Sequence, residues 1–129
     1  MRAYLDADIL IWHLRNHPTA TALIASLHAA AADLWAAASQ RMEILAHMRA
    51  PEEANTLRLL ALFRTQPITE PIVDLGAELF RRFHPSHGIG KNDALLAAAA
   101  MLTDGRIVTR NMKHFPMPGL VVQQGWPSI

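Results

Sequence analysis

The run that most constrains the fold stands at the start of the chain, where three apolar residues are followed at once by two acids. Residues 3–5 have the length and character of a buried strand, and Asp6 and Asp8 come directly after it. Residues 9–12 are apolar and begin a helix. Ligands of open α/β sheets bind beyond the carboxyl ends of the strands. Carboxylates placed there are costly to bury unless a cation lies beside them, so this run predicts half of a metal site.

Strands and helices alternate along the rest of the chain. The expected strands or extended pieces are residues 3–5, 33–38, 66–70, 106–109 and 120–122. The expected helices are residues 9–15, 19–31, 40–48, 52–63, 72–83 and 91–102. This alternation predicts a single domain over residues 1–129, an α/β fold in which a central parallel sheet lies inside a three-layer α/β/α sandwich.

Four local features follow from the same patterns. Ser39 is the expected N-cap of the helix at 40–48, and Met42 is expected to face inward. Residues 84–90 are predicted to form a loop because of their composition. Gly105 is expected to supply the left-handed residue that ends the helix before it.

The composition excludes several classes of protein. The chain has 129 residues, enough for one buried core, and no cysteine, which excludes a disulfide scaffold and a thiolate metal site. No stretch resembles a membrane span or a signal peptide, so we expect a soluble, cytoplasmic protein without membrane contact. The net charge of +1 does not by itself indicate a nucleic-acid-binding protein.

Further polar residues occur where strands or loops meet helices. Asp93 opens a helix that is otherwise almost wholly apolar, and an acid that enters a buried helix needs a partner. Thr109 and Asn111 end and follow an apolar strand, so they are expected at the same sheet edge as Asp6. Glu43, taken alone, is better explained as a solvated residue of an amphipathic helix.

In their order and spacing, these pieces resemble the PIN-domain family, and in particular the toxin ribonucleases of VapBC-type toxin–antitoxin pairs. The similarity extends over essentially the whole chain. The matching segments are 5–11 (LDADILI), 38–44 (ASQRMEI), 86–89 (SHGI), 93–98 (DALLAA) and 108–115 (VTRNMKHF).

The resemblance implies a metal-dependent endoribonuclease that hydrolyses RNA phosphodiesters and leaves 5′-phosphate and 3′-hydroxyl ends. It implies Asp6, Glu43 and Asp93 as ligands of Mg²⁺ or Mn²⁺, hard cations that favour oxygen donors. Asn111 stands where many relatives have a fourth acid, so one metal or two remains open. Asp8 stands where relatives often have Ser or Asn, and it is either an additional acid of the site or a local feature.

The resemblance also suggests roles for the residues around the acids. The hydroxyl of Thr109 is expected to hold Asp6 or a water, and Asn111 to ligate the metal or to orient the site. Positively charged side chains that contact RNA phosphates would make binding salt-dependent. The candidates for such contacts are Lys91, Arg110 and Lys113.

The implied partners are a second copy of the chain and an antitoxin. The family resemblance predicts a homodimer, and a heterotetramer or larger assembly with an antitoxin that blocks the acidic site with a basic side chain. Trp12 and Leu14 are candidate antitoxin contacts, and packing of Trp12 in the core is an equal alternative.

Two other functions are considered beside the nuclease. A receiver-like phosphoacceptor domain also has paired acids after its first strand, but it needs a mid-chain strand that ends in Asp, where this sequence predicts a helix. A PIN fold that binds RNA with weak or no cleavage is compatible with Asn111. The seven histidines show no compact metal-binding spacing, so His47, His87 and His114 are interpreted as surface or capping residues.

Overall fold

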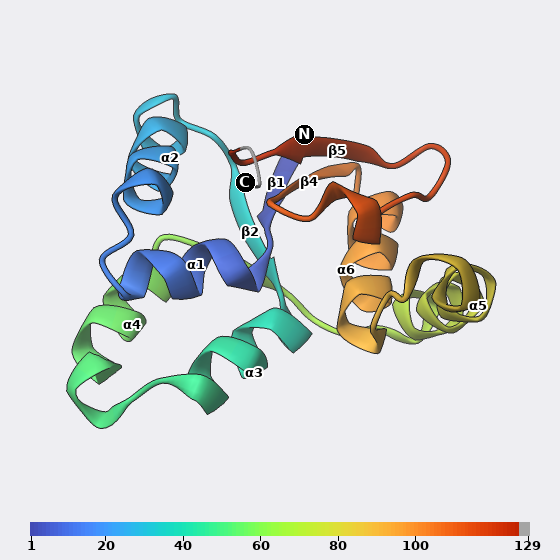
Figure 1. Cartoon of the computed structure of the whole chain (residues 1–129), viewed down its shortest axis with the longest axis horizontal. Helices are drawn as coiled ribbons and strands as arrows, with labels where there is room; N and C mark the ends of the chain where they lie inside the picture. Colours follow the sequence, from blue (N-terminus) through green and yellow to red (C-terminus); the bar gives the residue numbers. More distant parts are fainter. Residues whose placement is uncertain (127–129) are drawn as a thin grey trace.

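A computed structural model describes residues 1–126, which form one parallel sheet with helices on both faces (Figure 1). The strands are β1 (Arg2–Leu5), β2 (Leu34–Ala37), β3 (Arg64–Gln66), β4 (Gly105–Thr109) and β5 (Val121–Gln124). Their spatial order is β3-β2-β1-β4-β5, and every neighbouring pair is parallel. The last three residues of the predicted domain, 127–129, lie outside the described residues.

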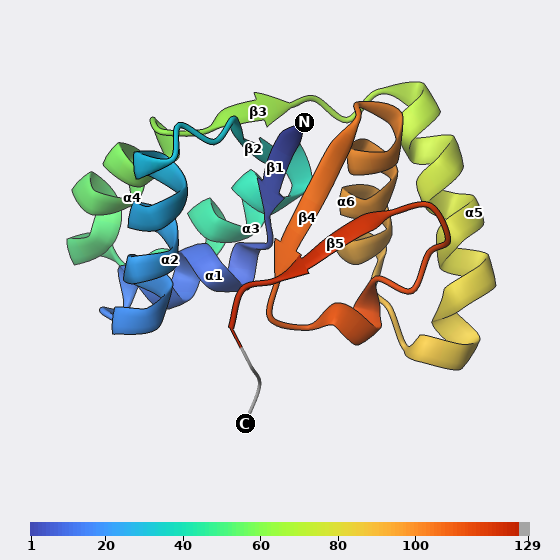
Figure 2. The same ribbon diagram turned by 90° about the horizontal axis from the view of Figure 1, so that it is seen from above.

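The helices form the two outer layers of the sandwich. They are α1 (Ala7–Leu14), α2 (Pro18–Ala29), α3 (Ala38–His47), α4 (Glu53–Leu60), α5 (Glu70–His87) and α6 (Lys91–Leu102), with 3₁₀ turns η1 (Ala50–Glu52) and η2 (Met112–His114). Figure 2 shows α1, α2 and α4 on one side of the sheet and α5 and α6 on the other. The predicted three-layer sandwich with a parallel sheet is therefore confirmed. Within residues 1–126, no helix is both long and apolar enough to cross a membrane.

Alternating side chains of the central strand enter opposite cores. Ala3 and Leu5 of β1 pack with the α1, α2 and α4 layer, whereas Tyr4 packs with α5 and α6. A strand buried on both faces is apolar throughout, as the first residues of this chain are. Helix α6 is buried almost all round, and its alanines at 97–100 allow close packing between α5 and the sheet.

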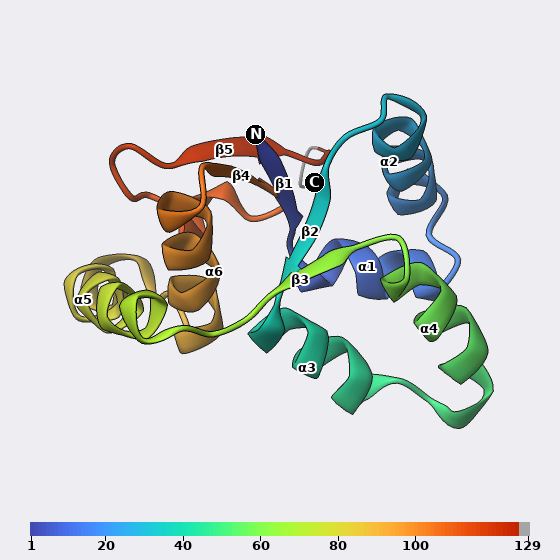
Figure 3. The same cartoon turned by 180° about the vertical axis from the view of Figure 1, so that it is seen from behind.

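The chain builds the sheet outward from β1 in one direction and then in the other. After β1 it forms β2 and β3, and it then passes from α4 along β3 to α5 on the opposite face (Figure 3). Strand β4 returns beside β1, and β5 completes the sheet. The connections after β1 and β4 therefore leave toward opposite faces, and a crevice at the carboxyl ends of such strands is the usual ligand site of α/β folds.

Helix α5 extends beyond its predicted end. It continues through His87, so the loop expected at 84–90 is wrong for its first four residues. Phe83 packs in the core, and Gly88, at φ 64°, supplies the left-handed residue that ends the helix. Pro85 lies in the last turns, where its missing N–H costs one helical hydrogen bond.

The start and the buried face of α3 also differ from the prediction. Strand β2 passes directly into α3 at Ala38, so Ser39 is a buried residue inside the helix and not its N-cap. Met42 is 72% exposed, not inward-facing. Gln40 and Ile44, one helical turn apart, face the core instead. Met42 lies half a turn from both, so the same orientation turns it outward.

Gly105 is required for space and not for a left-handed backbone. The residue with positive φ after α6 is Asp104, at 53°, so the expectation for Gly105 was wrong. A Cβ atom at Gly105 would lie 2.6 Å from Cε2 of Tyr4. The Tyr4 ring is fully buried, and its hydroxyl lies 2.7 Å from Oγ1 of Thr103. The ring therefore has little freedom to move away.

We expect Gly105→Ala to lower the free energy of unfolding by about 1–3 kcal/mol, the usual cost of overpacking a core. Denaturant titration would measure the loss. Gly90→Ala is the control, because its Cβ would lie 3.7 Å from the nearest side-chain atom, and its loss should be smaller. Equal losses for the two variants would contradict the steric explanation.

Candidate active site

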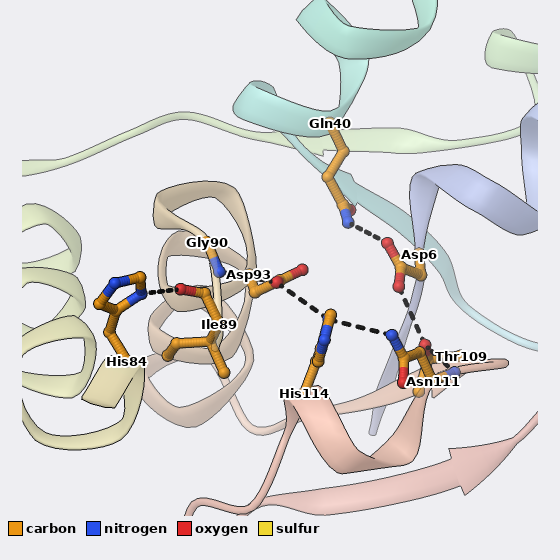
Figure 4. Close-up of polar contacts among 9 residues, drawn as sticks. All are labelled: Asp6, Gln40, His84, Ile89, Gly90, Asp93, Thr109, Asn111 and His114. Atoms are coloured by element: carbon orange, nitrogen blue, oxygen red, sulfur yellow. Dashed lines mark hydrogen bonds and ion pairs between the residues drawn. The ribbon is translucent and has the colours of Figure 1, made fainter. Parts of the chain in front are cut away.

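Asp6 lies where the carboxyl ends of β1 and β4 meet. Its Oδ2 accepts a hydrogen bond of 2.9 Å from Oγ1 of Thr109, the last residue of β4. Its Oδ1 accepts a hydrogen bond of 3.2 Å from Nε2 of Gln40, in α3 (Figure 4). The expected contact between the Thr109 hydroxyl and Asp6 is thus present. Two donors, one at the end of β4 and one in the helix after β2, thus fix the carboxylate that follows β1.

Gln40 is a site residue that the sequence analysis missed. It is only 2% exposed, and its polar end reaches Asp6 from the helix that follows β2. The available signal was a polar residue one turn before the buried Ile44. That signal has meaning only once the inward face of α3 is known.

Asp93 is held at the start of α6. Its Oδ2 accepts a 3.0 Å hydrogen bond from the backbone N–H of Gly90, and it lies 3.4 Å from Nδ1 of His114. Nδ1 of His84 lies 2.8 Å from the carbonyl oxygen of Ile89, a contact that ties α5 to the connection before α6. In Figure 4, the His84–Ile89 contact lies to the left of Asp93, and the His114 ring lies between Asp93 and Asn111. The buried helix therefore has the partner that its acid was expected to need.

Asn111 connects the β4 side of the site to His114. Its backbone N–H donates a 3.0 Å hydrogen bond to Oγ1 of Thr109, and its side-chain Nδ2 lies 3.0 Å from Nδ1 of His114. His114, whose side chain is 31% exposed, thus also contacts two site residues, which its interpretation as a surface or capping residue did not include. His47 and His87 are exposed, as expected.

The acids of the site influence one another electrostatically. Burial, with smaller contributions from the charges of Asp8 and Asp93, raises the pKa of Asp6 to about 7 against the opposing hydrogen bond from Thr109. Burial also raises the pKa of Glu43, again with contributions from Asp8 and Asp93. The structure thus brings Asp6, Glu43 and Asp93 to one region, and it adds Asp8 to them.

These residues fit a hard divalent cation. No three Asp, Glu or His side chains of residues 1–126 converge into a ready-made metal cluster. The acids nevertheless carry more negative charge than their surroundings stabilise, as the raised pKa of Asp6 indicates. Two buried oxygens at the same edge, Oγ of Ser39 and Oε1 of Gln40, have no hydrogen-bond partner among the described residues. Oxygen donors of this kind suit Mg²⁺, which keeps several waters and needs few direct protein ligands.

Two hollows border the acids. One of about 280 Å³ is lined by Asp8, Arg110, Asn111 and Lys113. The other, of about 430 Å³, includes Glu43 among its lining residues. The hollows therefore adjoin acidic residues that follow different strands.

The three basic side chains that are candidates for RNA contacts lie in different surroundings. The guanidinium carbon of Arg110 lies 5.5 Å from the ring centre of Trp12 and 5.1 Å from that of Trp126. Lys113 is exposed beside Arg110, whereas Lys91 is exposed at the start of α6 and lines a different hollow. Arg110 and Lys113 thus share one hollow with site residues.

The two candidate antitoxin contacts lie on α1. Trp12 is 42% exposed, so the alternative that it packs in the core is wrong. Leu14 lines a hollow of about 430 Å³ that residues of α1, α2 and α4 share.

Solved structures with the same fold are toxin–antitoxin complexes. DNA-bound VapBC from Salmonella typhimurium aligns with a TM-score of 0.79 and 18% identity, over 98% of this chain and 99% of that one. A toxin–antitoxin complex from Klebsiella pneumoniae aligns with a TM-score of 0.78 and 23% identity, with the same coverage. At these identities the likeness shows a shared fold.

Sequence comparison gives nearer relatives. Ribonuclease VapC19 of Mycobacterium tuberculosis is 36% identical over 114 residues, which cover 88% of this chain and 91% of that protein. Ribonuclease VapC10 of the same organism is 38% identical over 114 residues, 88% of this chain and 85% of that protein. The family model described as PIN domain matches residues 3–116. Since that match spans most of the sequence and the relatives cover nearly all of it, the chain belongs to the PIN-domain family.

Proposed function

We propose that this protein is a divalent-metal-dependent endoribonuclease and the cytoplasmic toxin of a toxin–antitoxin pair. The observation that carries the proposal is the buried carboxylate of Asp6 at the carboxyl ends of β1 and β4, with its pKa raised to about 7 and other acids beside it. Such a group is costly unless a cation stabilises its charge. The relatives named ribonuclease VapC19 and VapC10 support RNA as the substrate.

Each residue of the site has a part in this proposal. Asp6, Glu43 and Asp93 hold Mg²⁺ or Mn²⁺, while Thr109 fixes Asp6 and Asn111 orients the β4 side. When bound, the cation supplies Lewis-acid stabilisation of the charge that develops during phosphodiester hydrolysis. Asp6 must first lose its carboxyl proton, because a ligating carboxylate is deprotonated.

The substrate lies across the acidic edge. The RNA backbone contacts Lys91, Arg110 and Lys113, and hydrolysis leaves 5′-phosphate and 3′-hydroxyl ends. The position of Arg110 and Lys113 in one hollow with Asp8 and Asn111 supports this placement, since positive charge there balances the acids and attracts a polyanion.

A mid-chain feature argues against the phosphoacceptor alternative. Strand β3 ends at Gln66, and residues 67–69 contain no acid. The second aspartate that a receiver-like domain needs is therefore not delivered by this strand.

A second copy of the chain covers an exposed apolar face formed by α3, α5 and α6. Met42, Ile68 and Val73 are 72%, 45% and 46% exposed. The hollow that contains Glu43 and a neighbouring hollow of about 320 Å³ share Ile68 and Leu95. Apolar surface of this kind supports a homodimer, whose second copy would border the acidic site.

The antitoxin binds on the α1 side. The exposed Trp12 and the hollow beside Leu14 offer apolar contacts there, and the acids nearby would attract a basic side chain that blocks them. With two toxin copies, such a partner gives a heterotetramer or a larger assembly.

We expect Glu43→Gln to reduce RNA cleavage by roughly 10²-fold or more, the usual effect of removing one charge-stabilising group. Cleavage of a mixture of structured RNAs by the toxin free of antitoxin, with Mg²⁺, Mn²⁺ or chelator, would measure it. Glu53→Gln is the control, since Glu53 is exposed on α4.

Metal-dependent cleavage that Glu43→Gln removes and Glu53→Gln retains would support the nuclease. An inert but folded wild-type protein that still binds RNA would instead favour a PIN fold that binds RNA without cutting it.

Without a cation, we expect Tm to fall as the pH rises from about 4 to about 7. The pKa of Asp6 is raised from 3.8 to about 7 in the folded protein, so the stability present at low pH is lost progressively between these two values, and the decrease levels off above 7. Added Mg²⁺ should raise Tm at the higher pH, because a ligand of the folded state stabilises it. Asp6→Asn should reduce both effects. A wild-type Tm that ignores Mg²⁺ at every pH would contradict cation binding.

We expect Met42→Glu to convert the dimer into a monomer, because it places a charge in the apolar face. Light scattering would give the mass of each form. Met101→Glu, at an exposed methionine near the end of α6, is the control and should remain dimeric. A dimeric Met42→Glu variant would place the interface elsewhere.

A further inference from the structure

One atom of His114 lies between two site residues that come from different parts of the chain. Nδ1 of His114 is 3.0 Å from Nδ2 of Asn111 and 3.4 Å from Oδ2 of Asp93. His114 ends the η2 turn, whereas Asp93 lies at the start of α6. Figure 4 shows the imidazole ring between the two side chains.

We propose that His114 is a positioning residue, which sets the orientation of Asp93 and Asn111 and thereby the affinity of the site for a divalent cation. It does so without ligating the cation. The inference rests on the proposed metal-dependent function, and it adds a residue that the acidic motif does not include.

The contacts form a continuous connection across the site. The hydroxyl of Thr109 donates a hydrogen bond to Asp6. The oxygen of that hydroxyl accepts a hydrogen bond from the backbone N–H of Asn111. The side chain of Asn111 contacts His114, which contacts Asp93. Asp6, directly after β1, and Asp93, in α6, are thereby joined through three polar side chains. A substitution of His114 would therefore remove a contact of Asp93 and a contact of Asn111 at the same time.

Because both side chains contact Nδ1 of His114, the orientations of Asp93 and Asn111 depend on each other. An imidazole nitrogen carries either a proton or a lone pair. With a proton, Nδ1 donates to Asp93, and Asn111 must turn its amide oxygen toward the ring. With a lone pair, Nδ1 accepts the N–H of Asn111, and Asp93 keeps the hydrogen bond from Gly90. In both cases, His114 determines which atom of the Asn111 amide remains for the site.

This orientation has more effect for Asn111 than it would for an acid. A carboxylate attracts a cation through its charge in any rotamer, whereas an amide contributes only when its oxygen is directed correctly. Residues that orient ligands typically change metal affinity by roughly 10- to 100-fold. His114 therefore gives the neutral Asn111 a defined role.

A purely structural role for His114 is a weaker explanation. Its side chain is 31% exposed, so its removal leaves no large cavity. The neighbouring Phe115 and Met117 are 4% and 3% exposed and anchor the same segment in the core. The loop therefore has its own packing, and the His114 contacts serve the site.

The test compares Mn²⁺ affinity in the intact protein, by titration calorimetry or by Mn²⁺ electron paramagnetic resonance. We expect His114→Phe to weaken Mn²⁺ binding by roughly 10-fold, at the lower end of the effect of such residues. His114→Asn should bind close to wild type, because its amide places a donor or an acceptor near the position of Nδ1. His28→Phe, at an exposed position of α2, is the control and should bind as wild type does.

The outcomes separate this inference from the proposed function. Wild type that neither binds Mn²⁺ nor cleaves RNA would overturn both. Wild type that binds and cleaves, together with unchanged affinity in His114→Phe, would overturn the role of His114 alone. Equal weakening in His114→Asn and His114→Phe would also overturn it, since a positioning contact should survive the conservative change. Tm values of the two variants should agree, and a loss of affinity that follows a loss of Tm would indicate structural damage instead.

Discussion

The arrangement of the active site depends on holding one buried carboxylate, that of Asp6, at the end of the central strand. Burial and neighbouring acids oppose its charge and raise its pKa to about 7. The hydrogen bond from Thr109 acts in the opposite sense, because a donor to a carboxylate stabilises its charged form, and Gln40 donates a second hydrogen bond to the same group. Thr109 ends β4 and Gln40 follows β2, the strands on either side of β1. Asp6 is therefore held only when three neighbouring strands are paired correctly.

The register of β1 against β4 determines whether Thr109 lies beside Asp6. Leu5 stands opposite Val108, and the backbone N–H of Asp6 donates a 2.9 Å hydrogen bond to the carbonyl of Val108. A slip of one residue would turn Thr109 to the other face of the sheet and remove its contact with Asp6. The two residues are far apart in sequence, so the core that aligns these strands also assembles this part of the site.

Local patterns predicted the features that depend on a short stretch of chain, and they failed where the packing angle of an element decides. The helix at 91–102 has the predicted bounds, and the strand that precedes Asp6 is present. The outward turn of Met42 and the contact of Gln40 with Asp6 both depend on how α3 leaves β2, which no residue of α3 encodes alone. His114 was missed because one of its two partners, Asp93, comes from a distant segment, and the spacing of histidines carries no information about that contact.

In the proposed metal site, the placement of acids is compatible with an amide at position 111. The family resemblance implies an acid there in many relatives, and it implies Ser or Asn at position 8, where this chain has Asp8. The charge of Asp8 raises the pKa of both Asp6 and Glu43, so it already adds to the negative potential that attracts a cation. A further carboxylate at 111 would increase the repulsion among groups that are difficult to ionise. Asn111 avoids that repulsion, and the proposed metal site then depends on the orientation of the amide at position 111, where a carboxylate would act through its charge.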